Sequence, residues 1–234
     1  MEKFLGQITH LDLGIFGAEC AGWSANTTPG FTQFMDKYLP RDIMKYLINL
    51  KHLRLEASEL SVVGAGVHGG DLFAPCGRIP ALETLELKNI VLGFAFQSFL
   101  GNQGDDLREL TLHNCMCIAI PGSQEFEWSD NEPDEIQWSD IWACVVAGCP
   151  AMRKVTYLQD ERPPVPARME DEIDADLNPN VWRYVVIDEQ WGTVEEDEDA
   201  NAEEILLHHA CMAYGEMMKV LAYRRAKDES SSEA

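Results

Sequence analysis

A short hydrophobic pattern, Leu-x-x-Leu-x-Leu, recurs along the first two thirds of the chain. Its copies are Ile8-x-x-Leu11-x-Leu13, Leu50-x-x-Leu53-x-Leu55, Leu82-x-x-Leu85-x-Leu87, Leu107-x-x-Leu110-x-Leu112 and the degenerate Met152-x-x-Val155-x-Tyr157. Successive side chains of an extended strand point to opposite sides, so the fourth and sixth positions of each copy face the same way. Each copy therefore predicts a short strand whose two apolar side chains enter a common core.

The segments between the copies predict how the chain returns from one strand to the next. Apolar residues have helical spacing at 31–39, where Pro40 is expected to end the helix, and again at 96–100 and 136–146. The copies start 42, 32, 25 and 45 residues apart. Only the third interval lies within the usual ~20–29 residues of a leucine-rich repeat, so the others predict insertions. We expect residues 1–160 to form an α/β fold, an irregular leucine-rich-repeat-like β-α solenoid with parallel strands and outer helices.

The rest of the chain predicts an acidic C-terminal extension and a terminal helix. Residues 161–200 are rich in proline and acidic residues, and they are expected to form a linker and a short hairpin with strands at 181–187 and 191–194. Residues 201–227 predict a single helix, because acidic residues precede its start and basic residues lie near its end. The polar residues 228–234 are expected to be a disordered tail.

The charge of the chain is strongly negative and unevenly distributed. The formal net charge is −22, and residues 113–204 carry 23 acidic and 5 basic residues, a net charge of −18. Negative charge repels nucleic-acid backbones and anionic membranes, so neither is expected as a partner. The acidic stretch is interpreted either as a solvated, partly disordered segment or as a docking surface for a basic protein.

Two further features of the sequence bear on its location in the cell. No apolar run reaches the ~18 residues that a membrane span needs, and residues 1–7 have neither a long apolar segment nor a small-residue cleavage site, so no signal peptide is expected. Seven cysteines, an odd number, favour reduced thiols over a disulfide scaffold. We therefore expect an intracellular protein, cytoplasmic or nuclear.

Sequence motifs that would indicate catalysis are weak or missing. Gly64, Gly66 and Gly69 have the spacing of a dinucleotide-binding loop, but the glycines and prolines that follow cannot sustain the helix that such a loop requires. A glycine-rich loop inserted between repeats is the simpler interpretation. Neither G-x-S-x-G nor H-E-x-x-H occurs in the chain. We expect no cofactor and no enzymatic activity.

Four cysteines, in the pairs Cys115-x-Cys117 and Cys144-x₄-Cys149, suggest a zinc site at first sight. The first pair, however, occupies the ninth and eleventh positions of a repeat copy, which are expected to face the interior. Free cysteine packs there as a small apolar side chain. We interpret the four as core residues, and no metal site is predicted.

The candidate binding site is the side of the predicted strands opposite to the leucines. Positions three, five and seven of each copy flank the buried leucines and are expected to form an exposed concave face. They are His10, Asp12, His52, Arg54, Glu56, Thr84, Glu86, Lys88, Glu109, Thr111 and His113, followed by Lys154, Thr156 and Leu158 in the degenerate copy. Their mixed charge favours a protein partner over a phosphate chain. The alternative is an ordinary solvated sheet face that binds nothing.

Two stretches of the chain resemble one protein family. The run Leu107-Arg-Glu-Leu110-Thr-Leu112-His-Asn-Cys115 is similar to the late repeats of fungal F-box proteins with leucine-rich-repeat-like C-terminal halves, and residues 182–199 are similar to the tail of the same family. The resemblance implies a substrate receptor of a cullin-type ubiquitin ligase, in which the solenoid grips the substrate.

The sequence departs from that family in the F-box itself. Leu39-Pro40-Arg41-Asp42 has the form of an F-box opening, but the repeat copy at Leu50 begins too soon afterwards for the remaining adaptor-binding helices. The ligase adaptor is therefore expected to bind only if an F-box lies upstream. The predicted function is a non-catalytic protein–protein recognition module. The alternative is a free-standing acidic leucine-rich-repeat protein that binds a basic protein.

Overall fold

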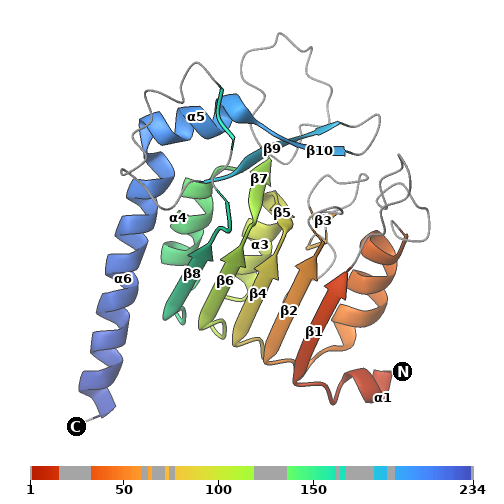
Figure 1. The fold of residues 1–234 in the computed structure, drawn as a ribbon. Helices are drawn as coiled ribbons and strands as arrows, with labels where there is room; N and C mark the ends of the chain where they lie inside the picture. Colours follow the sequence, from red (N-terminus) through yellow and green to blue (C-terminus); the bar gives the residue numbers. More distant parts are fainter. Residues whose placement is uncertain are drawn as a thin grey trace.

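The computed structural model describes residues 2–15, 33–58, 63–64, 72–73, 77–118, 136–161, 164–166, 182–188 and 193–232. Within these residues the strands form two sheets, and helices cover one side of the larger sheet (Figure 1). The chain is therefore a mixed α/β protein, as the hydrophobic pattern predicts.

The larger sheet, sheet A, is parallel throughout and has the strand order β1-β2-β4-β6-β8. Its strands are β1 (His10–Ile15), β2 (His52–Ala57), β4 (Thr84–Lys88), β6 (Glu109–His113) and β8 (Lys154–Leu158). Leu53 of β2 lies opposite Leu85 of β4, which lies opposite Leu110 of β6. The five predicted strands and their register are thus confirmed.

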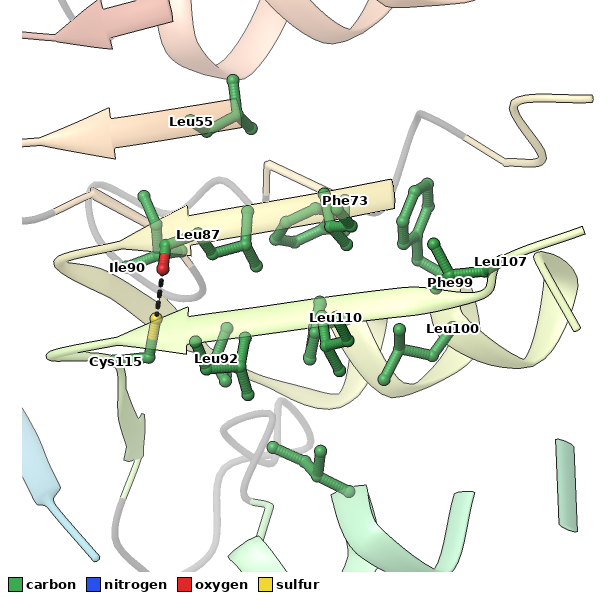
Figure 2. Packing of buried hydrophobic residues seen from close by; sticks show 14 of the residues in the cluster. Leu55, Phe73, Leu87, Ile90, Leu92, Phe99, Leu100, Leu107, Leu110 and Cys115 are labelled. Carbon is green, nitrogen blue, oxygen red and sulfur yellow. Dashed lines mark hydrogen bonds between the residues drawn. The ribbon is translucent and has the colours of Figure 1, made fainter. Parts of the chain in front are cut away.

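Alternating burial along the strands places the leucines of sheet A in the core. Leu55, Leu87 and Leu110 are buried, and they point toward the side chains of helix α3 (Phe94–Asn102) in Figure 2. Within each strand, the residues that alternate with the leucines are partly or fully exposed. Leu11 and Leu13 of β1 are only partly buried, because among the described strands only β2 pairs with β1.

A second sheet, sheet D, has the strand order β10-β9-β7-β5-β3. Its strands are β3 (Val63–Gly64), β5 (Ile90–Leu92), β7 (Met116–Ile118), β9 (Tyr184–Asp188) and β10 (Thr193–Glu196). Strands β9 and β10 pair antiparallel, so the predicted hairpin is confirmed. The short strands β5 and β7 follow β4 and β6 after a turn, and the sequence pattern did not predict them.

An asparagine makes each of those two turns. Asn89 and Asn114 have φ angles of 56° and 49°, in the left-handed region that asparagine adopts more readily than most residues. The Asn89 side-chain amide donates to the carbonyl of Ala57, 2.7 Å away on the neighbouring strand. Each turn thus redirects the chain from sheet A to sheet D, and Asn89 also ties its own turn to the preceding strand.

Helices α3 and α4 (Trp138–Gly148) confirm the helical segments predicted at 96–100 and 136–146. Helix α4 begins with a capping box, in which Gln137 and Asp140 satisfy each other's backbone N–H groups. Four aromatic or apolar residues of α4 are buried on one face: Trp138, Ile141, Trp142 and Val145. Both helices therefore pack an apolar face against sheet A, as expected from their spacing.

The N-terminal helical segments differ from the prediction. Helix α1 (Glu2–Leu5) precedes β1, and a π-helix, η2 (Phe34–Ile43), runs through Pro40 into the 3₁₀ turn η3 (Met44–Tyr46). The expectation that Pro40 ends the helix was wrong. In a π-helix the donor bonds a carbonyl five residues back, as Met44 N–H does with Leu39 O, and this wider turn accommodates the proline ring.

The C-terminal region holds two helices, so the single helix predicted at 201–227 was wrong. Helix α5 (Glu198–Leu207) and helix α6 (His209–Ser232) are separated at His208, whose φ is 56°. The break is stabilised from within α5, because the Glu204 carboxylate accepts a 2.5 Å hydrogen bond from the Ala210 N–H at the start of α6.

Helix α6 also extends beyond its predicted end. Residues 228–232 were expected to be disordered, but they are helical. Asp228 forms an ion pair with Arg153, which immediately precedes β8, and the hydroxyls of Ser230 and Ser231 donate to Lys227 O. These contacts continue the helix along the side of the molecule (Figure 1).

An aromatic cluster joins α4, β8, α6 and the residues before β9. Trp182 lies with its ring centroid 4.5 Å from Tyr157, 5.4 Å from Trp142 and 5.3 Å from Tyr214. Trp138 stacks on Trp142 with a 5.4 Å centroid distance. This cluster fixes the C-terminal elements to the last strand of sheet A.

Candidate functional site

The predicted binding residues lie together on the side of sheet A opposite to the leucines. Strand register aligns them in three rows: His10, His52, Thr84, Glu109 and Lys154; Asp12, Arg54, Glu86, Thr111 and Thr156; and Gly14, Glu56, Lys88, His113 and Leu158. All are partly or fully exposed. We call this surface, without Gly14, the polar face. It contains four acidic and three basic residues.

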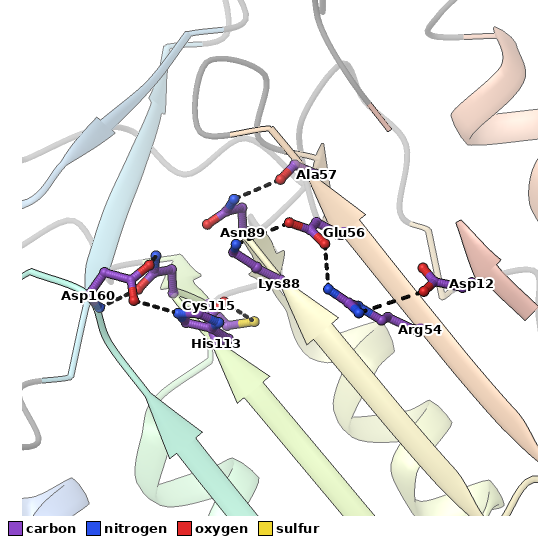
Figure 3. Close-up of polar contacts among 10 residues, drawn as sticks. Asp12, Arg54, Glu56, Ala57, Lys88, Asn89, His113, Cys115 and Asp160 are labelled. Atoms are coloured by element: carbon purple, nitrogen blue, oxygen red, sulfur yellow. Dashed lines mark hydrogen bonds and ion pairs between the residues drawn. The ribbon is translucent and has the colours of Figure 1, made fainter. Parts of the chain in front are cut away.

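Ion pairs link the charged residues on β1, β2 and β4 (Figure 3). Arg54 lies 3.6 Å from Asp12 and 2.7 Å from Glu56, and Lys88 lies 3.0 Å from the other oxygen of Glu56. The Lys88 hydrogen bond, with a further contribution from Arg54, lowers the pKa of Glu56. The charged side chains on this half of the face are therefore already engaged with one another.

Histidines border the same half. The rings of His10 and His52 stack at a centroid distance of 5.8 Å, and His52 Nε2 lies 3.6 Å from a carboxylate oxygen of Glu86. The Thr9 hydroxyl lies 3.0 Å from His10 Nδ1. These contacts follow from the parallel register, which brings position three of β1 beside position three of β2.

Asp160 belongs to the site although the sequence pattern did not predict it. Its carboxylate lies 2.8 Å from His113 Nε2 and accepts a 2.9 Å bond from the Asn114 amide, whose oxygen accepts from the Asp160 N–H (Figure 3). The hydrogen bonds from His113 and Asn114 lower the pKa of Asp160. No motif marks Asp160, because it lies just after β8 and reaches back to β6.

The half of the polar face on β6 and β8 is less charged. Its centre consists of Thr111 and Thr156, which are opposite each other on neighbouring strands. The Leu158 side chain is 46% exposed beside them. Lys154 and Glu109, 3.6 Å apart, form the border. The centres of protein interfaces are poor in charged side chains and have a polar rim, and this half of the face shares that distribution of charge.

The cysteines predicted to be core residues are placed differently in the two pairs. Cys115 and Cys117 are fully buried, and burial raises the pKa of Cys115 to about 12. The Cys115 thiol donates to Leu87 O, 3.5 Å away (Figure 2). Cys149 is also fully buried, but Cys144 is only half-buried. No group of three His, Cys, Asp or Glu side chains suited to a metal occurs among the described residues.

The glycine motif has a packing role at the one position that is described. Gly64 has a φ of 137°, and a Cβ atom there would lie 2.0 Å from Val91 O, so only glycine fits between β3 and β5. Gly66 and Gly69 lie outside the described residues. At its first residue the interpretation as a loop between repeats was wrong, because Gly64 belongs to strand β3 and pairs with Val91 of β5.

One surface hollow lies away from the polar face. It has a volume of about 870 Å³ and is lined by residues of α1, η2 and η3: Glu2, Lys3, Tyr38, Asp42, Ile43 and Tyr46. No predicted site residue contributes to it.

Among the described residues, no helix combines the length and apolarity needed to cross a membrane.

Comparison with known proteins places the chain in no family: no family model, curated protein or solved structure matches it. The resemblance to fungal F-box proteins therefore stays a prediction from the sequence.

Proposed function

We propose that the chain is a non-catalytic recognition module, a leucine-rich-repeat-like solenoid whose polar face binds another protein. The observation that carries the proposal is the register of sheet A, which presents equivalent positions of five strands as one continuous exposed surface. Adjacent strands are about 4.8 Å apart. Five strands therefore span about 20 Å, a width that suits a peptide segment or the edge of a folded domain.

The chemistry of the polar face favours a protein over other partners. Acidic and basic residues are nearly balanced on it, although the whole chain carries a net charge of −22. A nucleic-acid site needs an excess of Lys and Arg to neutralise phosphates. Mixed charge around an uncharged centre instead gives orientation and specificity toward another protein.

The centre of the proposed interface is the threonine–leucine area formed by Thr111, Thr156 and Leu158. Binding energy in protein interfaces is concentrated where a large side chain fills a dry central area. The charged half of the face is already internally paired, as Glu56 shows through its bonds to Arg54 and Lys88. We therefore assign affinity to β6 and β8, and orientation to β1, β2 and β4.

The family resemblance extends this proposal to a substrate receptor of a cullin-type ubiquitin ligase. The described residues support one expectation about this role, namely that the chain by itself does not bind the ligase adaptor. Leu39 and Pro40, which have the form of an F-box opening, are buried in η2 and cannot contact an adaptor without unfolding that segment. We propose that the 234-residue chain folds alone but does not bind the adaptor, which co-purification of the two proteins would contradict.

Site-specific photo-crosslinking tests the binding face. A photoreactive phenylalanine analogue at Thr111 or Thr156 should capture the partner in cells, whereas the same residue at Ser98 or Ala143, exposed on α3 and α4, should not. With the captured protein purified, Thr156→Arg should weaken binding at least about tenfold, and Ala143→Arg should leave it unchanged. Equal capture from both sides of the molecule, or equal affinity of the two arginine variants, would refute the assignment.

A second candidate, binding of a basic protein by the acidic region, has one observation in its favour. Glu195, Glu198, Asp199 and Glu203 are exposed at β10 and the start of α5. Exposed charges are screened beyond about 8 Å at physiological ionic strength, so such binding should weaken steeply with salt. Deletion of residues 195–199 should abolish it and leave binding through the polar face intact.

A further inference from the structure

Strand β1 is the outermost strand of sheet A, and among the described strands only β2 pairs with it (Figure 1). Thr9 O accepts from the N–H of His52, which shows that the backbone groups of the odd-numbered residues are turned toward β2. The N–H and C=O groups of His10, Asp12 and Gly14 therefore point away from the sheet. Gly14 has no side chain and is exposed, so the backbone of β1 is accessible to solvent.

The opposite edge of sheet A, strand β8, is better covered. Val155 and Tyr157 of β8 are buried, and the Tyr157 ring lies 4.5 Å from that of Trp182 in the aromatic cluster. Leu11 and Leu13, at the equivalent positions of β1, are only partly buried. Proline, lysine and β-bulges protect edge strands from pairing with other chains, and β1 has none of the three. Strand β1 is therefore an open edge that can accept a further strand.

We propose that β1 pairs antiparallel with β1 of a second copy of the chain, about a two-fold axis at Leu11, and that the chain is thereby a homodimer. With Leu11 at the axis, His10 of each copy lies opposite Asp12 of the other. An imidazole, which donates a hydrogen bond and carries positive charge when protonated, thus meets a carboxylate at two places. Cross-strand pairs of this kind stabilise a sheet, so the polar side chains of β1 complement those of its own copy.

The backbone and the neighbouring registers agree with this axis. His10 and Asp12 both have outward-facing backbone groups, so each of the two pairs also exchanges two backbone hydrogen bonds. An axis at Asp12 would place that carboxylate opposite its own copy, and like charges in such positions are destabilising. An axis at Leu13 would place Asp12 opposite Gly14, which offers no side-chain donor. The side chains of β1 thus favour the axis at Leu11.

Dimerisation extends the surface formed by sheet A. Residues that are opposite each other in an antiparallel pair lie on the same side of the sheet. The polar faces of both copies therefore lie on one side of a single sheet of ten strands, five from each copy. The pairing itself does not depend on what the polar face binds.

Sedimentation equilibrium of the purified full chain tests the dimer. One strand pair is a small interface, so we expect a monomer–dimer equilibrium with a Kd on the order of 10 µM. Asp12→Pro removes an outward N–H and the carboxylate, and it should raise Kd at least about tenfold. The matched control Asp12→Asn keeps the N–H and should raise it less. Circular dichroism establishes that both variants are folded. A chain that stays monomeric up to about 100 µM, or a folded Asp12→Pro variant that dimerises as tightly as the wild type, would overturn the proposal.

Exchange of the cross-strand pair tests the complementarity of β1 with its own copy. His10→Glu places two carboxylates opposite each other at both pairs and should weaken dimerisation about tenfold. The double variant His10→Glu/Asp12→Lys reverses the pair and should restore most of the affinity. A double variant that dimerises no better than His10→Glu would contradict the pairing of these two side chains.

Cysteine crosslinking tests the register. At the axis the two Leu11 Cα atoms are expected about 4.5 Å apart, within the range of about 4.4–6.8 Å that a disulfide needs. Leu11→Cys should therefore form an intermolecular disulfide under mild oxidation, which mass spectrometry locates at the substituted position. Leu13→Cys, which lies opposite Thr9 of the second copy, should not. More crosslinking through Leu13→Cys than through Leu11→Cys would refute the axis at Leu11.

Discussion

Truncation of Leu110 to alanine tests the register of sheet A directly, because this side chain lies at the centre of the repeat. Leu110 is on β6, opposite Leu85 on one neighbouring strand and Val155 on the other. It is completely buried, and Figure 2 shows it above helix α3. Removal of three side-chain carbons leaves a void that strands on both sides prevent from collapsing.

The expected loss of stability follows from that confinement. Leucine-to-alanine changes in cores cost about 2–5 kcal/mol, and the cost rises with the volume of the cavity that remains. We expect about 3–5 kcal/mol for Leu110→Ala, since its neighbours are fixed by strand pairing. The matched control is Leu11→Ala at the equivalent position of β1. Leu11 is partly exposed, so about 1–2 kcal/mol is expected there.

Urea denaturation followed by tryptophan fluorescence measures both values. Trp138, Trp142 and Trp182 form a buried cluster beside β8, so their emission should change when sheet A unfolds. A loss below about 0.5 kcal/mol for Leu110→Ala would refute the register, because a buried core position does not tolerate this change so easily. A larger loss for Leu11→Ala than for Leu110→Ala would refute the order of burial.

Three further predictions concern polar groups. Asn114→Ala should lower stability by about 1–3 kcal/mol, because it removes both bonds to Asp160 and strains the left-handed turn; Asn114→Gly, which relieves the strain, should lower it less, as measured by urea denaturation. Glu56→Gln should cost about 0.5–1 kcal/mol at neutral pH. Because the folded pKa of Glu56 is lowered, this difference should disappear as the pH falls below 4.5 through the folded value. Burial raises the pKa of Glu204, so its contribution to stability should grow as the pH falls through that raised value toward 4.5; thermal melts of Glu204→Gln should lack this pH dependence.

The strands of sheet A could be predicted because apolar and polar residues alternate along them, and only one strand register buries all of the apolar side chains. A slip of one residue would turn Leu85 and Leu87 to solvent and bury Glu86. Strands β5 and β7 of sheet D gave no such signal. Residues 90–92 and 116–118 are continuous apolar runs of three residues, and a run that short is compatible with strand, helix or loop.

The C-terminal break was missed for a local reason. His208 adopts a left-handed conformation without being glycine or asparagine, so the usual sequence sign of a helix end is absent. What permits the break is the Glu204 carboxylate, which supplies the Ala210 N–H with an acceptor from one turn earlier. A contact of that kind depends on two helices already lying at an angle, which periodicity does not encode.

On the polar face too, the sequence pattern predicts which residues are exposed but not which of them contact each other. Alternation determined which residues face outward, but not that Arg54 and Lys88 both bind Glu56. That pairing changes the expected energetics of binding, because a partner's acid or base gains only the difference between the new contact and the one it replaces. Thr111 and Thr156 have no ion pair to lose, so burying them leaves the full packing energy available. Under the proposed function, variation at these two threonines should therefore change which protein is bound, whereas variation at Arg54 should chiefly change how fast it binds.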